Sequence, residues 1–314
     1  METSELEKLA IRNRFMREAG IALVLSSIVL AAFLFIPLQK TPQEAVASTV
    51  STSTPDAFKN MGLAAESAIV LDLVTGETLY DKNSNAQLPL ASLTKLLTIE
   101  SAVRELGIDV PITISAADVA VDSPHRFVPG DVLTLADLAR LTLTASLNDG
   151  AEAIAEATAA REATTTSSML ASAAAALGLT ETFALNGSGL DMSTSVSGAY
   201  GSAHDIALLA GALVTNAPDI ALATTLPKAS ASTLTGKHYE ISNTNPTVEY
   251  APHLLLSKTG YTDLAGGNLA LVFDVGINHP IAVVLLGSTE EARFTDGQAL
   301  VAATLAHFAN IDSL

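Results

Sequence analysis

The chain has 314 residues, of which 49% are apolar and 16% charged, and its mean hydropathy is +0.39. This composition excludes an intrinsically disordered chain, and the length allows one large domain with appendages. A net charge of −17, few aromatic residues and no tryptophan argue against nucleic-acid binding, and the absence of cysteine removes disulfides, thiolate catalysis and zinc–thiolate sites.

The amino-terminal segment has the pattern of a membrane anchor. Residues 19–39 carry no charge, and about 20 apolar residues suffice for a helix that crosses a bilayer. Four basic residues precede them and place residues 1–18 in the cytoplasm by the positive-inside rule: Lys8, Arg12, Arg14 and Arg17. We expect a single-pass transmembrane signal anchor. The alternative is a secreted protein cleaved after Ala47, because Ala45-Val46-Ala47 has the small-x-small pattern of a cleavage site.

A tether and a folded domain are expected after this segment. Residues 40–60 are rich in Ser, Thr, Pro and Ala, a composition that predicts a flexible linker. Residues 61–314 then form one domain outside the cytoplasm. Beyond residue 40 the chain carries 11 basic and 29 acidic residues, so this outer part is strongly acidic.

Strands, a block of helices, further strands and a last helix follow one another in this domain. Ser67–Val74 and Glu77–Tyr80 are predicted strands joined by a turn, as are Asn268–Val275 and Ile281–Gly287. Helical spacing of apolar residues occurs over six ranges: 92–106, 134–146, 149–162, 165–177, 202–216 and 290–309. The order predicts an α/β (α+β) fold with an inserted all-α region.

The first of three short motifs is Ser92-Leu93-Thr94-Lys95, at the start of a predicted helix. A spacing of three places the Ser92 hydroxyl and the Lys95 amine on one helical face. A serine becomes a nucleophile when a neighbouring base takes its proton, and lysine is such a base when burial or another cation lowers its pKa. Taken alone, the motif is more often a helix-capping serine followed by a solvated lysine.

The second and third motifs are weaker by themselves. In Ser146-Leu147-Asn148, Ser146 could relay a proton and Asn148 could hold a substrate amide, although a capped turn between helices has the same residues. Lys258-Thr259-Gly260 fits an extended edge segment along which a peptide could pair as an added strand, or an exposed turn. Lys258 would be the second cation that keeps Lys95 neutral, and Thr259 could bind a substrate carboxylate.

The three motifs each occur once, in an order that resembles the active-site set of penicillin-recognising serine enzymes. Leu90–Thr98, Ser146–Asp149 and Lys258–Asp263 are similar to the low-molecular-mass penicillin-binding proteins, the serine D-alanyl-D-alanine carboxypeptidases. Further segments agree over roughly residues 63–305: 176–179, 182–190, 202–205 and 243–245. One departure is His204, where many relatives have arginine.

The resemblance implies a β-lactamase/transpeptidase-like fold, with an antiparallel sheet flanked by helices, in a bacterial cell-wall enzyme. The catalytic residues would be Ser92, Lys95, Ser146, Asn148 and Lys258, and the substrate-binding residues Thr259, Gly260 and Tyr261. Ser92 would attack the penultimate D-alanine of a peptidoglycan stem peptide, release the terminal D-alanine, and lose its acyl group to water. Backbone N–H groups of Ser92 and Tyr261 would form the oxyanion hole, and β-lactams would acylate the same serine. No cofactor is implied.

Three other functions stay open. Relatives without a second domain include DD-endopeptidases, which cut peptidoglycan cross-links. A class A β-lactamase would need a glutamate separated from Leu-Asn by two residues, and three residues separate Glu181 from Leu185-Asn186. The third alternative is a non-catalytic wall-binding module, although such a module would not require the three motifs to be intact. The six scattered histidines show no metal-ligand spacing, so we expect no metal site.

Overall fold

A computed structural model describes Met16 and residues 57–311. The predicted transmembrane segment 19–39, most of the linker 40–60 and the alternative cleavage site after Ala47 lie outside the described residues. None of the helices in the described part combines the length and apolar character needed to cross a membrane. Phe58, inside the range assigned to the linker, is buried and packs its ring against Tyr80 and His307.

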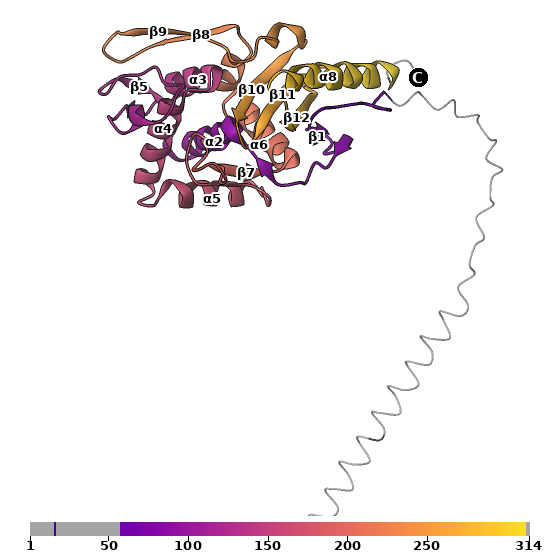
Figure 1. Cartoon of the computed structure of the whole chain (residues 1–314), viewed down its shortest axis with the longest axis horizontal. Coiled ribbons are helices and arrows are strands. Elements are labelled where there is room, and N and C mark those ends of the chain that lie inside the picture. Colours follow the sequence, from indigo (N-terminus) through magenta and orange to yellow (C-terminus); the bar gives the residue numbers. More distant parts are fainter. Residues whose placement is uncertain (1–15, 17–56, 312–314) are drawn as a thin grey trace, which may run out of the picture. The chain divides into compact units, whose positions relative to one another are not determined.

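The centre of the domain is a five-stranded antiparallel sheet in the order β10–β11–β12–β1–β2 (Figure 1). The strands come from both ends of the chain: β1 (Ser67–Asp72), β2 (Thr78–Lys82), β10 (Leu254–Thr262), β11 (Gly266–Asp274) and β12 (Pro280–Ser288). The first strand therefore pairs with the last one, and β10 lies at one edge of the sheet.

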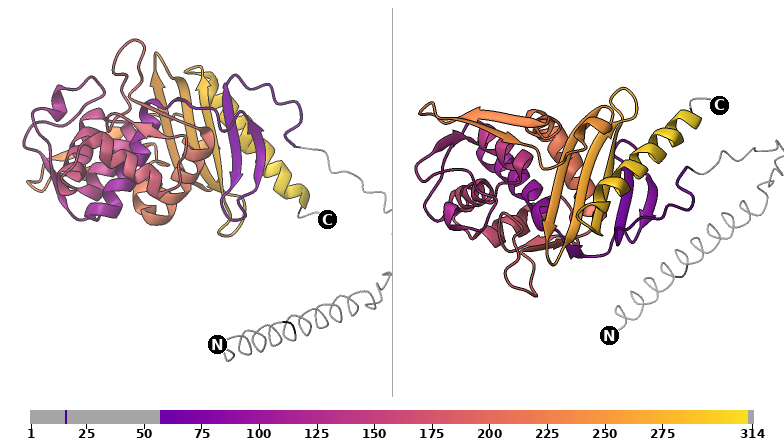
Figure 2. Two further views of the ribbon diagram at one scale, coloured as in Figure 1. Left: turned by 90° about the horizontal axis from the view of Figure 1, so that it is seen from below. Right: turned by 45° about the horizontal axis from the view of Figure 1, so that its top comes forward.

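Both faces of this sheet are covered, which explains the nearly continuous apolar runs of β1, β11 and β12. Ile69 and Leu71 belong to the core shared with the helical region, whereas Val70 belongs to the core under the last helix, α8 (Ala292–Ile311). Alternate residues thus face opposite layers, as strand geometry requires. Figure 2 shows the sheet between the helical region and α8.

The inserted helical region is confirmed, and the structure sets its bounds. The helices are α2 (Thr94–Leu106), α3 (Leu135–Ala145), α4 (Asn148–Arg161), α5 (Thr166–Ala176), α6 (Ala203–Asn216) and the short α7 (Pro218–Ala223). Short strands accompany them: β3 (Leu88–Pro89), β6 (Phe183–Ala184) and β7 (Ala199–Gly201) in one sheet, and β4 (Pro111–Thr113) with β5 (Val132–Thr134).

Two local features differ from the sequence-based expectation. The turn Ala91–Leu93 is a 3₁₀ turn, η1, so the α-helix that follows Ser92 begins at Thr94. A hairpin of β8 (Lys228–Ser232) and β9 (His238–Ser242) was not predicted. Its strands consist largely of small and polar residues, so they lack the apolar alternation that identifies a strand.

Asn268 on β11 joins the sheet to the segment that leads into Ser92. It is fully buried, its Nδ2 donates to Pro89 O at 2.9 Å, and its Oδ1 accepts from Gly287 N at 2.9 Å. A buried hydrogen-bonding group that loses its partner lowers the free energy of unfolding by about 1–3 kcal/mol. We therefore expect Asn268→Ala to lower the free energy of unfolding by about 3 kcal/mol, measured by urea denaturation.

The matched control is Asn85→Ala, at an exposed position in a turn. This substitution should change the free energy of unfolding by less than about 0.5 kcal/mol. Equal effects of the two substitutions would contradict the role given to Asn268.

Candidate active site

Ser92 lies in a tight turn that places its half-buried hydroxyl in front of α2. Ala91 takes a positive φ of 48°, a conformation that costs an alanine energy and has to be held by its surroundings. Thr94 Oγ1 donates to Ala91 O at 2.7 Å, and Leu90 N donates to Ala199 O at 3.0 Å. The backbone on both sides of Ser92 is therefore fixed by hydrogen bonds.

Lys95 is fully buried, and its amine has three oxygen partners. Its Nζ lies 2.7 Å from Ser92 Oγ, 2.8 Å from Asn148 Oδ1 and 2.9 Å from Ser188 O. An ammonium would donate to all three oxygens. A neutral amine would donate to Asn148 and Ser188 and keep its lone pair for the Ser92 proton. These contacts therefore accommodate both the protonated and the neutral form of Lys95, which a base has to adopt in turn.

Burial lowers the pKa of Lys95 to about 7, and the carboxylates of Glu152 and Asp149 oppose that shift. Of the two causes that the sequence suggests for a neutral Lys95, burial and a second cation, burial is the one that lowers its pKa here. The removal of water from the amine is the larger effect. A substantial fraction of Lys95 is thus unprotonated at neutral pH.

Ser146 and Asn148 lie on either side of the junction between α3 and α4. Ser146 ends α3 in the left-handed conformation, with φ 58°, and Asn148 is the first residue of α4. The Asn148 amide is held at both ends, because Oδ1 accepts from Lys95 and Nδ2 donates to Asp122 O at 2.8 Å. One N–H of this amide remains for the substrate contact that the sequence predicts.

The third motif lies on β10, the edge strand, as expected. Lys258 is buried rather than in an exposed turn, and its Nζ lies 2.9 Å from Ser146 Oγ. Burial, followed by the nearby charges of Lys95 and Arg293, lowers the pKa of Lys258 well below its ordinary value. Ser92, Lys95 and Asn148 are thus linked by hydrogen bonds, and Ser146 and Lys258 form a second hydrogen-bonded set.

The substrate-binding residues predicted on β10 lie beside this set. Thr259 Oγ1 is 2.6 Å from Thr244 Oγ1, and the Tyr261 side chain is 47% exposed. A Cβ on Gly260 would lie 3.2 Å from Ser92 N and 3.0 Å from Leu90 O. Glycine is therefore what allows the edge strand to approach the Ser92 turn so closely.

Sequence reasoning missed four residues that hold this arrangement. The carbonyl of Ser188 accepts from Lys95, and Ser188 N donates to Glu152 Oε1 at 3.0 Å. Arg293 on α8 is buried and donates to Gly260 O at 2.6 Å. Only Gly189 gave a signal in the sequence: it has φ 79°, and a Cβ there would lie 1.9 Å from Ala91 O.

Other residues that the sequence singled out lie elsewhere. Glu181 N donates to Asp205 Oδ2 at 2.8 Å, and His204 is the neighbour of Asp205 at the start of α6. Among the contacts of the described residues, neither touches Ser92 or Lys95. In the same part of the chain, no cluster of three His, Asp or Glu side chains is arranged to hold a metal ion.

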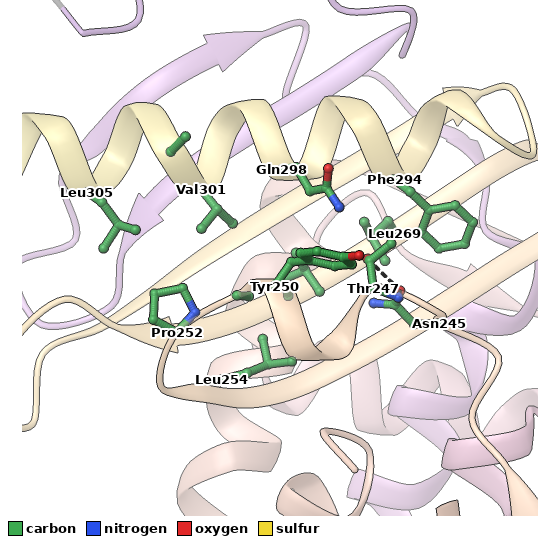
Figure 3. Close-up of a pocket in the computed structure, with 13 residues that line it drawn as sticks. Asn245, Thr247, Tyr250, Pro252, Leu254, Leu269, Phe294, Gln298, Val301 and Leu305 are labelled. Atoms are coloured by element: carbon green, nitrogen blue, oxygen red, sulfur yellow. Dashed lines mark hydrogen bonds between the residues drawn. The ribbon is translucent and has the colours of Figure 1, made fainter. Parts of the chain in front are cut away.

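A pocket of about 110 Å³ lies on the α8 side of the sheet (Figure 3). Leu269 and Leu271 of β11, the segment around Tyr250 and apolar residues of α8 line it. Asn245, also at its wall, donates to Ser257 Oγ at 2.8 Å. None of the eight candidate site residues lines this pocket, so it is separate from the candidate active site.

Comparisons with known proteins agree with the three motifs. The profile of peptidase family S11, described as D-alanyl-D-alanine carboxypeptidase, matches residues 50–289. The chain is 31% identical over 235 residues to the D-alanyl-D-alanine carboxypeptidase DacF of Bacillus subtilis, covering 73% of this chain. It spans only 59% of the length of that relative.

Two solved structures share the fold. A penicillin-binding protein homologue of Mycobacterium tuberculosis, Rv2911, superposes with a TM-score of 0.69 at 25% identity, covering 79% of this chain and 93% of that one. Penicillin-binding protein D2 of Listeria monocytogenes, solved in a cefotaxime-bound form, has a TM-score of 0.65 at 25% identity. That match covers 78% of this chain and 98% of the other.

The pKa of Lys95 leads to a prediction for the reactivity of Ser92. Acylation of Ser92 by a fluorescent penicillin should accelerate as pH rises, with a midpoint near pH 7, because only the neutral amine accepts the serine proton. Lys95→Arg should abolish labelling at every pH, because a guanidinium stays protonated. Lys59→Arg, at an exposed position, should leave the profile unchanged. A wild-type midpoint near pH 10 would contradict the lowered pKa of Lys95.

Proposed function

The chain belongs to the D-alanyl-D-alanine carboxypeptidase family, and from this premise we propose that it removes the terminal D-alanine of peptidoglycan stem peptides through an acyl-enzyme on Ser92. The observation that carries the proposal is the 2.7 Å contact between Ser92 Oγ and the buried amine of Lys95. A nucleophile, a base with lowered pKa and a fixed third partner are the elements of serine acyl transfer.

In the proposed acylation step, neutral Lys95 takes the Ser92 proton while Oγ forms a bond to the penultimate D-alanine carbonyl carbon. The backbone N–H groups of Ser92 and Tyr261 stabilise the oxyanion, and each such donor is commonly worth about 10²–10³ in rate. Collapse breaks the C–N bond and releases D-alanine. Lys95 gives up the proton it took from Ser92, and the leaving nitrogen receives it through Ser146, which lies 2.9 Å from Lys258 Nζ.

Deacylation reverses these proton movements. A water molecule gives its proton to neutral Lys95 as its oxygen attacks the ester carbonyl. The C–O bond to Ser92 then breaks, and Lys95 returns a proton to the serine oxygen. The shortened peptide leaves as a carboxylate, and the base is neutral again for the next cycle.

The edge strand supports the proposed mode of substrate binding. A stem peptide would pair with β10, the edge strand, as an added strand. Thr259 and its partner Thr244 would offer hydroxyl groups to the terminal carboxylate, and the free N–H of Asn148 would hold a substrate amide. β-Lactams would acylate the same serine, which agrees with the cefotaxime-bound form of the Listeria protein.

We further propose that residues 19–39 anchor the protein in the bacterial cytoplasmic membrane, with the catalytic domain on the outer face. The uncharged run and its basic flank support this proposal. The full chain should sediment with membranes, resist extraction by high salt and retain its N-terminal peptide by mass spectrometry. A soluble product that starts at Ser48 would instead establish cleavage after Ala47.

The activity is tested with the full chain and purified muropeptides, analysed by mass spectrometry. We expect loss of one D-alanine from pentapeptides, and no activity or penicillin labelling with Ser92→Ala. Ser195→Ala, at an exposed position, is the control and should behave as wild type. Activity of Ser92→Ala equal to wild type would overturn the mechanism.

The muropeptide products, together with the turnover of benzylpenicillin, separate the remaining functions. Splitting of cross-linked dimers would identify a DD-endopeptidase, and rapid turnover of benzylpenicillin a β-lactamase. Failure of the wild type to form an acyl-enzyme would favour a non-catalytic wall-binding module.

A further inference from the structure

Three side chains form a cluster that joins the β8–β9 hairpin to the loop at residues 122–131, and its carboxylate is buried. Asp131 is 6% exposed, and its Oδ2 accepts from Tyr239 Oη, from Lys237 Nζ at 3.2 Å and from Val128 N at 3.0 Å. The Lys237 amine lies 4.7 Å from the centroid of the Tyr239 ring. We name Asp131, Lys237 and Tyr239 the clasp.

The hydrogen bonds of the clasp favour the ionised form of the Asp131 carboxylate. Burial acts to raise the pKa of Asp131, but the hydrogen bonds from Tyr239, Val128 and Lys237 outweigh it and lower the pKa below its ordinary value. The carboxylate therefore stays charged at neutral pH. The ring of Phe127, in the same loop, packs edge-on against Tyr239 with centroids 5.1 Å apart, so apolar contact reinforces the polar one.

On one side, the clasp holds the loop that orients Asn148. Asp122 O accepts from Asn148 Nδ2 at 2.8 Å, and Pro124 O accepts from Asn148 N at 2.7 Å. The buried carboxylate of Asp149 accepts from Phe127 N at 2.8 Å. Movement of this loop would therefore turn the amide whose other end contacts Lys95.

On the other side, the hairpin is anchored at the catalytic strand. Its second strand continues into Thr244, which bonds to Thr259, and into Asn245, which bonds to Ser257. Figure 1 shows the hairpin running from there over α3 to β5. The clasp therefore connects β10 to Asn148 through the hairpin and the loop.

We propose that Asp131 and Tyr239 are positioning residues, which hold the 122–131 loop on the hairpin and thereby fix Asn148 against Lys95. This inference rests on the proposed acyl-enzyme chemistry. The clasp touches neither Ser92 nor Lys95 and acts through Asn148, which contacts Lys95. We therefore expect its main effect on the rate of Ser92 acylation and a smaller one on the initial affinity for the acylating ligand. A misplacement of a reacting group by about 1 Å can lower a rate by about 10².

The test uses Tyr239→Phe in the full chain, which removes one hydroxyl and retains the ring packing. Stopped-flow labelling with a fluorescent penicillin separates the first-order acylation constant from the dissociation constant of the first complex. We expect the acylation constant to fall about tenfold and the dissociation constant to stay within twofold. The control is Glu240→Gln on the same hairpin, which breaks an exposed ion pair with Lys228 that does not reach the loop. It should leave both constants unchanged.

A double-mutant cycle shows whether the effect passes through Asn148. In an Asn148→Ala background, Tyr239→Phe should have almost no further effect, because coupled residues are not additive. Asp131→Asn should reproduce the effect of Tyr239→Phe. An unchanged acylation constant in Tyr239→Phe, an equal fall in Glu240→Gln, or full additivity with Asn148→Ala would each overturn the proposal. Failure of the wild type to be acylated would instead refute the proposed function.

Discussion

The buried amine of Lys95 is the constraint on which the rest of the site depends. An ammonium removed from water costs several kcal/mol unless it is paired or loses its proton. Here the amine has no carboxylate in direct contact, only the oxygens of Ser92, Asn148 and Ser188. Its pKa of about 7 is the consequence, and it turns a common surface cation into a base beside a serine.

Each of the three oxygens comes from a different part of the chain, so the fold has to bring three segments together at the Lys95 amine. Ser92 is held by a strained turn, Asn148 by the start of α4, and Ser188 by a glycine-containing loop that contacts Ala91. The five-stranded sheet contributes the edge strand β10, whose Gly260 allows it to approach the Ser92 turn. The sheet's two faces are both covered, which holds this edge strand in place beside the Ser92 turn.

Much of this could be predicted from the sequence because the signals are local. Apolar spacing identified the six long helices and four of the five central strands, and the three motifs contain the serine, lysine and asparagine side chains that the structure brings close together. The burial of Lys95 and Lys258 could not be predicted, because it is created by residues distant in sequence. The Ser188 carbonyl carries no side-chain signal, and Arg293 resembles any basic residue on an amphipathic helix. The β8–β9 hairpin was not predicted, because the alternating alanine and serine residues of β8 have the composition of a loop.

The protonation state of Lys95 is the most direct test of this account, since every proposed step uses a neutral amine beside Ser92. A ¹³C NMR titration of protein labelled at lysine Cε, with the Lys95 signal assigned by its loss in Lys95→Arg, reports that state in the resting enzyme. The account predicts a titration midpoint near pH 7. A Lys95 signal that stays protonated to pH 9 would contradict it and would require another base for Ser92.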